Sequence, residues 1–582
     1  MFDEIEISLS YYRNRKLNKL RIAGNFSNLD LDVQLNVEKT ANQQKLQLTI
    51  LPQAEIEIIE LSLKLKHDFA TDERIFVNGY QSWTDSREFF LDEKLKTISR
   101  LAKPLLKKYQ FDKYGDYSFK QYARKAGEFH GYTYTYLRNG HNLKLLGSLS
   151  EKQGFTIISQ SVKKSEISIE KDCKNLCIDS EYLAFQLVLL DGSENFVFDQ
   201  YFSLMGIAKP NTLPMTGWTS WYNYYQAINE KIILENLQQL STYKKQIDIF
   251  QIDDGYQSFV GDWLEIDQQK FPQGMKYLAD SIKAKGYKAG IWLAPFVCET
   301  NSRIFREKQH WILKDAKGEL VLAGSNWSRF YALDFDNPEV KNYLQEVFSV
   351  ILHQWGYDLV KLDFLYAVCL IPNGKKTRGQ IMTEAMDFVR ECVGDKLILA
   401  CGVPLGPSFG RVDYCRIGCD VGLDWDDKAY MRLMHRERVS TKNAIGNAIG
   451  RRQLNGRAFL NDPDVFFLRD NNMQLTKTQK KTLAKINQLF GSLIFTSDEI
   501  QKYDAEKHQM FDQIMKSQNK KVTQVEIYPN GLVEVFYTQD EIEHLVLINL
   551  NARKHDYQQT ARNLAITLQP YESREIILEE NR

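Results

Sequence analysis

The sequence lacks several features that would place it in a class at once. Its 75 lysines and arginines are balanced by 75 aspartates and glutamates, whereas a nucleic-acid-binding protein normally carries a basic surplus. No run of about 18 apolar residues occurs, so we expect no membrane-spanning helix. The first ten residues, MFDEIEISLS, have neither the basic region nor the apolar run of a secretory signal. These absences predict a cytoplasmic protein without nucleic-acid or membrane partners.

Cysteine and histidine are too few and too scattered to suggest a zinc site. The eight cysteines include two C-x3-C pairs, Cys173/Cys177 and Cys415/Cys419, but neither pair has matching histidines. In a cytoplasmic protein such cysteines are expected to be free thiols. The nine histidines form no H-x-H or H-E-x-x-H motif. We therefore predict no metal and no cofactor, although an all-oxygen Mg²⁺ site stays open because that ion needs few protein ligands.

The composition predicts several domains with substantial hydrophobic cores. A single core stops growing well before 582 residues, and 43% hydrophobic residues argue against long disorder. Residues 1–205 alternate apolar and polar residues in short runs such as AEIEIIELSLKLK, which predicts an N-terminal antiparallel β-sandwich. A helix-like segment, LKTISRLAKPLLKKY, interrupts these runs.

The end of the chain, residues 518–582, returns to this alternation in runs such as GLVEVFYT. The dipeptide Asn530-Gly531 lies between two of the runs and indicates a β-hairpin. We expect a second, smaller antiparallel β domain here.

Residues 206–517 show a different pattern, in which short apolar runs alternate with amphipathic helical stretches such as NEKIILENLQQLSTYKK. This alternation is typical of a parallel sheet, and eight repeats predict a closed (β/α)8 TIM barrel. A doubly wound sheet is the alternative, but no G-x-G-x-x-G follows the first run. The eight apolar runs cover 215–221, 247–256, 287–296, 359–365, 397–403, 414–421, 457–466 and 491–498.

In such a barrel the carboxyl ends of the strands face the active site. Several runs carry charged residues at that end, which is costly in apolar surroundings unless the groups are paired or used. One strand-end aspartate is equally well explained as a helix cap, but this explanation weakens when several converge on one rim. The charged and uncharged candidates at these strand ends are Asp253, Asp254, Trp292, Lys361, Asp363, Cys401, Arg416, Asp420, Asn461, Asp462 and Asp464.

Two reaction classes fit a barrel mouth rich in carboxylates. One is Mg²⁺-dependent lyase or isomerase chemistry, and the other is glycoside hydrolysis by two carboxyl groups, a nucleophile and an acid/base. The many aromatic residues favour the second class, because flat rings pack on the C–H faces of sugars. Lys361 lies two residues before Asp363, so the two side chains share one face of their strand. We expect the Lys361 cation to lower the pKa of Asp363 and keep it ionised.

Nine motifs in order along the barrel resemble those of family 36 glycoside hydrolases, most of all the compact bacterial α-galactosidases. An ordered set of motifs is more specific than any single one, and NGYQSW at 78–83 extends the resemblance into the N-terminal region. The resemblance implies a β-sandwich, a (β/α)8 barrel and a C-terminal β domain. The nine motifs are GWTSWYNYY, FQIDDGYQ, GDWLEID, FPQGMKYLADSIKAKGYKAGIWLAPF, YALDFDNPEV, VKLDFLYA, ACGVPLGP, CRIGCDVG and FLNDPDVFFLR.

The resemblance also implies roles for individual residues. Asp363, the aspartate of the K-x-D motif, is expected to be the nucleophile, and Asp420 of R-I-G-x-D the acid/base. Arg416 either contacts the sugar 2-hydroxyl or orients the acid/base. The other implied substrate contacts are Asp253 and Asp254 on O4 and O6 of galactose, Lys361, and along the pocket wall Trp292, Trp221, Tyr222, Cys401 and Trp83, the last from the sandwich.

Neighbouring acidic residues carry other expectations. Asp413 is a rival acid/base, but it precedes the sixth run and is expected in a loop or at the strand start, so Asp420 is preferred. Asp424 is expected to cap the following helix. Asn461, Asp462 and Asp464 are expected to hold the seventh run and its loop.

The expected function is that of a retaining α-galactosidase, which removes terminal α-linked galactose from melibiose- or raffinose-type oligosaccharides by double displacement. An α-N-acetylgalactosaminidase or a galactosyl transferase on the same scaffold is an alternative. A non-catalytic sugar-binding protein is the alternative from another class. Nothing in the sequence indicates the oligomeric state.

Overall fold

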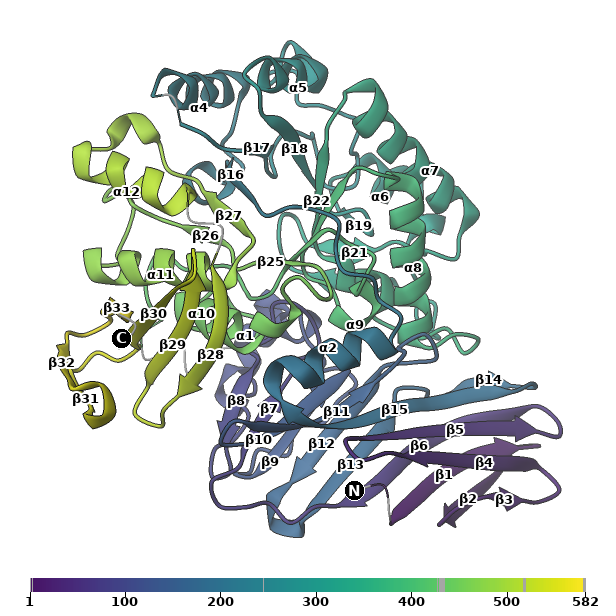
Figure 1. The fold of residues 1–582 in the computed structure, drawn as a ribbon. Helices are drawn as coiled ribbons and strands as arrows, with labels where there is room; N and C mark the ends of the chain where they lie inside the picture. Colours follow the sequence, from purple (N-terminus) through teal and green to yellow (C-terminus); the bar gives the residue numbers. More distant parts are fainter. Residues whose placement is uncertain are drawn as a thin grey trace.

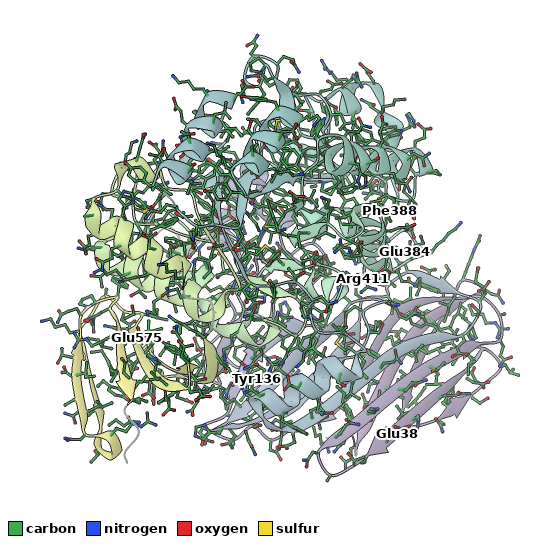
Figure 2. The ribbon with its side chains drawn as sticks, turned by 45° about the horizontal axis from the view of Figure 1, so that its top comes forward. Glu38, Tyr136, Glu384, Phe388, Arg411 and Glu575 are labelled. Carbon is green, nitrogen blue, oxygen red and sulfur yellow. The ribbon has the colours of Figure 1, made fainter. Side chains whose placement is uncertain are left out.

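The computed structural model describes residues 2, 4–243, 245–426, 428, 435–516 and 520–578, and only the backbone of Lys103, Lys107 and Ala561. Figure 1 shows a β-sandwich, a barrel with helices around it, and a small β-sheet beside the barrel. In Figure 2, Glu38 marks the sandwich, Phe388 a helix of the barrel and Glu575 the C-terminal sheet. The domain limits at residues 205 and 517 stay predictions, and the second falls on residues 517–519, outside the described residues.

The N-terminal part consists of two antiparallel sheets with the predicted alternation. In β1, Ile7, Leu9 and Tyr11 are buried while the residues between them are more exposed, as a strand with one face on a core requires. The sheet orders are β2-β1-β6-β13-β12-β9, with β14 also paired to β6, and β3-β4-β5-β15-β11-β10-β7-β8. The strands are β1 Ile5–Arg13, β2 Lys16–Ile22, β3 Phe26–Ser27, β4 Leu31–Lys39, β5 Gln43–Pro52, β6 Ile56–Lys66, β7 Arg74–Val77, β8 Arg87–Phe90, β9 Glu128–Tyr132, β10 Tyr134–Asn139, β11 Asn142–Ser148, β12 Thr156–Ser161, β13 Glu166–Lys171, β14 Leu176–Ile178 and β15 Tyr182–Ser193.

Two helical segments accompany the sandwich: one lies between β8 and β9, and the other lies between the last sandwich strand and the barrel. The helix-like segment forms η1 (Arg100–Ala102) and α1 (Lys103–Tyr109), followed by η2 (Phe111–Lys113). Helix α2 (Glu194–Leu204) lies between the sandwich and the barrel (Figure 1). One hydrophobic cluster runs from the barrel into the sandwich and includes Phe76, Tyr134 and Phe198. The two parts therefore share a core.

The middle of the chain forms the predicted barrel. Its sheet has the order β25-β24-β23-β22-β18-β17-β16-β27-β26, and its strands pair in parallel. Because the first strand, β16, pairs with both the second and the last apolar run, the doubly wound alternative is wrong. The strands are β16 Met215–Thr219, β17 Ile249–Ile252, β18 Lys288–Leu293, β22 Leu359–Leu362, β23 Leu397–Ala400, β24 Tyr414–Arg416, β25 Leu460–Asp462, β26 Val465–Phe466 and β27 Leu493–Thr496.

The seventh apolar run is divided into two strands instead of the single strand expected. β25 pairs with β24, and β26 pairs with β27, so the two halves of one run close the barrel. The break falls on Pro463, which has no N–H for a ladder, and on Asp464, whose φ of 80° lies in the left-handed region. The break therefore lets one chain segment reach both neighbouring strands.

The helices of the barrel begin and end at sequence signals. Thr377 and Thr476 form capping boxes with Gln380 and Gln479 at the starts of α8 and α11. Among the described residues, no helix is both long and apolar enough to cross a membrane. The helices are α3 Trp221–Tyr224, α4 Glu230–Thr242, α5 Gly274–Ala284, α6 Arg303–Glu307, α7 Pro338–Ser349, α8 Arg378–Val393, α9 Leu405–Ser408, α10 Thr441–Gly450, α11 Lys477–Phe490 and α12 Ala505–Met515.

Two smaller sheets complete the fold. The aromatic-rich insertion after β18 forms a three-stranded antiparallel sheet of β19 (Val297–Glu299), β21 (Phe330–Ala332) and β20 (Leu322–Gly324). The C-terminal part forms a sheet of order β28-β29-β30-β33 and a separate β31-β32 pair. The predicted hairpin is present, since Asn530 and Gly531 connect β28 and β29. These strands are β28 Lys521–Ile527, β29 Leu532–Gln539, β30 Ile542–Asn549, β31 His555–Gln559, β32 Leu564–Leu568 and β33 Ser573–Leu578.

Two glycines should respond oppositely to replacement by alanine. A Cβ at Gly217 in β16 would lie 2.0 Å from the Phe495 ring, so Gly217→Ala should lower the free energy of unfolding by about 1–3 kcal/mol through overpacking. A Cβ at Gly446 in α10 would meet nothing within 4 Å, so Gly446→Ala should raise it by up to about 1 kcal/mol. Chemical denaturation of both variants tests this prediction, and equal changes in the free energy of unfolding would contradict the packing described for Gly217.

Candidate active site

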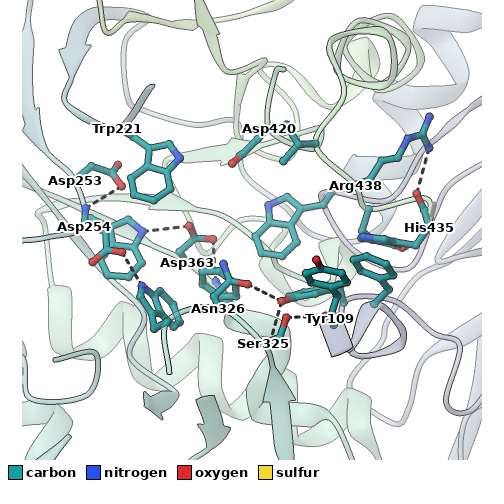
Figure 3. Close-up of a pocket in the computed structure, with 18 of the residues that line it drawn as sticks. Tyr109, Trp221, Asp253, Asp254, Ser325, Asn326, Asp363, Asp420, His435 and Arg438 are labelled. Carbon is teal, nitrogen blue, oxygen red and sulfur yellow. Dashed lines mark hydrogen bonds and ion pairs between the residues drawn. The ribbon is translucent and has the colours of Figure 1, made fainter. Parts of the chain in front are cut away.

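A cavity of about 470 Å³ opens at the carboxyl ends of the barrel strands (Figure 3). Residues from the sandwich, the insertion and the loop after β24 complete its wall, so the site belongs to more than the barrel. Its depth is set by Asp253 and Asp254, each 2% exposed, and its outer edge by Tyr109 and Val439, which are 41% and 53% exposed. The lining residues are Trp83, Tyr109, Phe111, Tyr114, Trp221, Asp253, Asp254, Trp292, Ser325, Asn326, Trp327, Lys361, Asp363, Phe364, Asp420, His435, Glu437, Arg438 and Val439.

Asp253 follows the fully buried strand β17 and is held by two side chains from strands. Lys361 Nζ and Gln251 Nε2 donate to Asp253 Oδ2 at 2.8 and 2.7 Å. Lys361 lies in β22 and forms a buried ion pair with this carboxylate. Burial would lower the pKa of Lys361, but the nearby carboxylates of Asp253 and Asp363 raise it. Lys361 therefore stays a cation at the base of the cavity.

Asp254 accepts hydrogen bonds only from neutral donors in the described structure. Trp327 Nε1 and Gln226 Nε2 donate to Oδ2 at 2.8 and 2.9 Å, and Gln257 Nε2 donates to Oδ1 at 2.6 Å. Burial raises the pKa of Asp254 to about 6, and these hydrogen bonds only partly offset the rise. The carboxylate is thus ionised at neutral pH at a cost in stability.

Asp363 directly follows β22, and the next residue, Phe364, has a φ of 52° in the left-handed region. This turn brings the Phe364 N–H to Asp363 Oδ1 at 2.9 Å. Trp292 Nε1 donates to Asp363 Oδ2 at 3.1 Å. A non-glycine residue with such a φ stores strain, and here the strained turn fixes the carboxylate at the cavity.

Lys361 lowers the pKa of Asp363 as expected, but this effect does not set the net direction. The pKa of Asp363 is raised, first because the carboxyl is removed from water, while Lys361 lowers it by a smaller amount. The negative charge of Asp420 raises it further. The lysine forms its ion pair with Asp253 instead, at 2.8 Å. Sequence spacing gave the shared strand face but could not show which carboxylate the ammonium reaches.

Asp420 and Arg416 form one hydrogen-bonded unit. Both terminal nitrogens of Arg416 donate to Asp420 Oδ1, at 3.0 and 2.9 Å. Arg416 Nη2 also lies 2.6 Å from Asp464 Oδ1 and donates to the Tyr222 hydroxyl at 2.9 Å. The Tyr222 hydroxyl in turn donates to Asp464 Oδ2. The side chain of Asp420 is 32% exposed, whereas that of Arg416 is 2% exposed, so the carboxyl faces the cavity and the guanidinium lies behind it.

Trp83 reaches the cavity from the sandwich and packs on the barrel. Its Nε1 donates to Cys401 Sγ at 3.2 Å, and its ring meets Phe364 edge-on at 5.2 Å between centroids. Gly402 has a φ of 58°, and a Cβ there would lie 2.8 Å from the Trp83 ring. Burial raises the pKa of the Cys401 thiol well above its usual range, so this cysteine contacts Trp83 as a neutral group.

The structure brings most of the candidate residues together in one cavity. Three of them, Tyr222, Cys401 and Arg416, are absent from its lining and lie one layer deeper. Trp221 lines it from α3, and Asp464 supports Arg416 from the break in the seventh run. Those that line the cavity are Trp83, Trp221, Asp253, Asp254, Trp292, Lys361, Asp363 and Asp420.

Several lining residues were not among the sequence candidates. Trp327 binds Asp254 and comes from the insertion, whose aromatic content was a usable signal. Tyr109 and Phe111 stack at 5.4 Å, and Phe111 stacks on His435 at 4.8 Å. These residues come from distant parts of the chain, and no local pattern marks Arg438 or His435 as part of a site.

The two other acidic positions lie outside the cavity. Asp413 accepts from Arg390 Nη1 and from the Ile398 N–H, both at 2.9 Å, at the start of strand β24. It therefore lies at the opposite end of the strands from Asp420. Asp424 accepts from Lys428 and from the Asp426 N–H. Residues 427 and 429–434 lie outside the described residues, and the next described helix, α10, is capped by Ser440 instead of Asp424. Within the described ranges, no group of three His, Cys, Asp or Glu side chains is arranged to hold a metal ion.

Known proteins share parts of this chain. The family described as Melibiase matches residues 213–390. An α-galactosidase of Escherichia coli is 28% identical over 178 residues, covering 29% of this chain and 24% of that protein. Alpha-galactosidase 1 of Pediococcus pentosaceus is 25% identical over 171 residues, covering 27% and 22%. The aligned segments thus span less than a quarter of these curated relatives.

Solved structures match over much more of the chain. The α-galactosidase TtGalA of Thermus thermophilus, in complex with p-nitrophenyl α-D-galactopyranoside, is 26% identical with a TM-score of 0.70, covering 88% of this chain and 96% of that one. The GH36 α-galactosidase AgaA of Geobacillus stearothermophilus is 12% identical with a TM-score of 0.64, covering 94% and 80%, and shows the shared fold.

The structure is a (β/α)8 barrel with flanking β-sheets, and its candidate site places Asp363 and Asp420 on one cavity at the carboxyl ends of the strands. Within this class of fold, the chain is similar to the GH36 α-galactosidases: residues 213–390 match the Melibiase family, and TtGalA shares its fold over 88% of the chain.

The raised pKa of Asp254 predicts a pH-dependent stability. The pKa is about 6 in the folded protein and near 3.8 in the unfolded chain. Below pH 3.8 the carboxyl is protonated in both states and costs nothing, whereas above pH 6 the folded state holds a buried anion. Relative to Asp254→Asn, the wild type should therefore lose about 2–3 kcal/mol of unfolding free energy between pH 4 and pH 7. Denaturation at both pH values tests this, and a constant difference would contradict the raised pKa.

Proposed function

We propose that this chain is a retaining α-galactosidase that removes terminal α-linked galactose from melibiose- or raffinose-type oligosaccharides. The observation that carries the proposal is the single cavity onto which Asp363, Asp420, Asp253 and Asp254 all open (Figure 3). A pair of carboxyl groups facing one bound sugar is what glycoside hydrolysis requires. Relatives with α-galactosidase in their names support the choice of galactose.

Asp363 is proposed as the nucleophile. One of its oxygens accepts from the Phe364 N–H and the other from the indole of Trp292, so the carboxylate is held by two donors in a fixed orientation. In the first step an Asp363 oxygen forms a bond to C1 as the bond from C1 to the leaving oxygen breaks. The product is a β-linked glycosyl ester. The strained turn at Phe364 supports this role, because it fixes the attacking oxygen before substrate arrives.

Asp420 is proposed as the acid/base. Both bonds from Arg416 fall on Oδ1, so Oδ2 is the oxygen available for proton transfer. The protonated carboxyl gives its proton to the leaving oxygen, and the carboxylate then takes a proton from the water that attacks C1 and releases the α-anomer. Of the two roles left open for Arg416, its contacts support the orienting one, since it binds Asp420 and is absent from the cavity lining.

Recognition of galactose is assigned to the deep end of the cavity. Asp253 and Asp254 are proposed to accept hydrogen bonds from O4 and O6, with Lys361 beside them as a donor. Trp83, Trp221 and Trp292 supply aromatic surface for the C–H faces of the ring. Tyr222 and Cys401 are proposed to support this wall from behind, because each binds a residue of the site but lies outside the lining.

The outer half of the cavity is proposed to take the leaving sugar. It is lined by the stack of Tyr109, Phe111 and His435 and by the polar side chains of Asn326 and Arg438. Structures of TtGalA with stachyose and of an AgaA variant with raffinose support oligosaccharides as the substrate class. A cytoplasmic location is also proposed, on the support of eight free thiols, most of them buried.

Replacing either of the two proposed catalytic aspartates should lower kcat, by an amount that depends on the residue and on the leaving group. Asp363→Asn should lower kcat for p-nitrophenyl α-D-galactopyranoside by about 10³-fold or more, because no covalent intermediate can form. Asp420→Asn should lower kcat by about 10²–10⁴-fold for a substrate with a poor leaving group, such as raffinose, because the leaving oxygen then needs a proton. Asp413→Asn is the control, since Asp413 binds Arg390 at the other end of the barrel and should affect stability alone. Turnover that survives in Asp363→Asn would contradict the assignment.

A substrate screen separates the proposed function from its alternatives. We expect hydrolysis of p-nitrophenyl α-galactoside well above that of the α-N-acetylgalactosaminide, with the α-anomer of galactose as the first product by NMR. Preference for the N-acetyl substrate would identify an α-N-acetylgalactosaminidase, and galactosylated sugars formed at high sucrose concentration would identify a transferase. Galactose binding in calorimetry without turnover of any glycoside would identify a sugar-binding protein.

A further inference from the structure

Arg451 is a fully buried cation that no carboxylate neutralises within the described structure. It follows helix α10, is 0% exposed, and forms no ion pair with the acidic side chains of the described residues. By contrast, the neighbouring Arg452 binds Glu194, and Arg416 binds Asp420. Burial lowers the pKa of Arg451 to about 10. A buried cation of this kind lowers stability relative to an apolar side chain. We therefore expect its contribution to come from the groups that the guanidinium holds in place.

All five N–H groups of the Arg451 guanidinium find oxygen acceptors. Nε donates to Asn78 Oδ1 at 3.2 Å, Nη1 to the Ser82 carbonyl at 2.6 Å, and Nη2 to the Gln81 and Gly79 carbonyls at 3.1 and 3.5 Å. The second bond of Nη1 goes to the Ile417 carbonyl at 2.9 Å. Because the five donors form a rigid planar fork, they fix the positions of all these oxygens relative to one another.

The acceptors belong to two segments that meet at the cavity. Four lie in residues 78–82 of the sandwich, immediately before Trp83, which lines the cavity. The fifth belongs to Ile417, the residue after Arg416, which holds Asp420. Arg451 thus links the turn that carries Trp83 to Ile417, in the segment between Arg416 at the end of β24 and the proposed acid/base Asp420.

The turn needs such a link because it comes from another part of the chain. Residues 78–86 also meet the barrel through other hydrogen bonds, and their partners include Val403, Glu437, Arg436, Asn447 and Cys401. None of these five partners lies in the segment from Arg416 to Asp420. Only a small shift of the turn is tolerated, since the Trp83 ring already packs against Gly402.

We propose that Arg451 is a positioning residue that sets the place of Trp83 over the terminal sugar and so determines how tightly the substrate is held. It acts through Trp83 and does not itself line the cavity. The expected change in KM rests on the proposed function, whereas the expected loosening of the turn at residues 78–83 does not.

The kinetic test compares Arg451→Lys with Arg452→Lys. Lysine keeps the charge but cannot reach five oxygens, so Arg451→Lys should raise KM for p-nitrophenyl α-D-galactopyranoside about tenfold and lower kcat less than about threefold. Arg452→Lys is the matched control, because Arg452 is buried next door and contacts Glu194 and the Ile449 carbonyl but not the turn. It should lower stability and leave KM unchanged. An unchanged KM in Arg451→Lys, or an equal rise in Arg452→Lys, would overturn the proposal.

A double-mutant cycle with Trp83→Phe tests whether Arg451 acts through Trp83. If it does, adding Arg451→Lys to Trp83→Phe should change kcat/KM by less than about twofold, although each single change costs more. Additive losses would mean that Arg451 acts through other residues and would refute the inference. Should Arg451→Lys fail to fold, Asn78→Ala removes one acceptor and should give a smaller rise in KM that is again lost in the Trp83→Phe background.

Hydrogen exchange gives a measurement that needs no substrate. The amides of residues 79–86 should exchange faster in Arg451→Lys than in the wild type, and at the wild-type rate in Arg452→Lys. If the wild type cleaves no galactoside, the proposed function fails while this comparison still decides the role of Arg451. Equal exchange in wild type and Arg451→Lys would overturn the inference even in an active enzyme.

Discussion

The ion pair between Arg416 and Asp464 is the interaction on which both barrel closure and the site depend. Asp464 lies at the break between β25 and β26, where one apolar run divides to pair with both of its neighbours. The same carboxylate accepts from the Val421 N–H and from the Tyr222 hydroxyl, so it joins the first, sixth and seventh units of the barrel. Because Arg416 also holds Asp420, the geometry that closes the barrel is the geometry that orients the proposed acid/base.

The site gathers several buried carboxyl groups, whose ionised forms are destabilised by removal from water. Burial raises the pKa of Asp254, Asp363, Asp462 and Asp464. Neutral hydrogen-bond donors at Asp254, and nearby cations at the other three, offset the rise only in part. Buried anions of this kind lower stability at neutral pH. The hydrophobic core shared by the barrel and the sandwich raises the free energy of unfolding and so opposes this loss of stability. The neutral sugar proposed as the substrate would bring hydroxyl donors to Asp254 and Asp363, which line the cavity.

The N-terminal sandwich is part of the active centre and not only an appendage. It supplies Trp83, and the segment after β8 supplies Tyr109, Phe111 and Tyr114 to the cavity wall. Besides the shared core, the turn at residues 78–86 is attached through backbone carbonyls, hydroxyls and buried guanidinium groups, contacts that fix direction more than they add stability. The shape of the outer half of the cavity can therefore change through residues far from the barrel strands in sequence.

The sequence by itself determined the strand and helix pattern, because alternation with period two and amphipathic helices are local consequences of burying one face. It also determined which residue types stand at the strand ends, and so the candidates Asp253, Asp254, Asp363 and Asp420. Only the tertiary structure decided how these groups pair: Lys361 binds Asp253 while Asp363 stays raised in pKa, and the seventh run splits at Pro463 and Asp464. His435 lines the cavity and Arg451 supports it, and no local sequence pattern marked either residue. The reason is that hydrogen bonds and charge interactions act over a few ångströms in space, and the spacing of residues along the chain does not fix those distances.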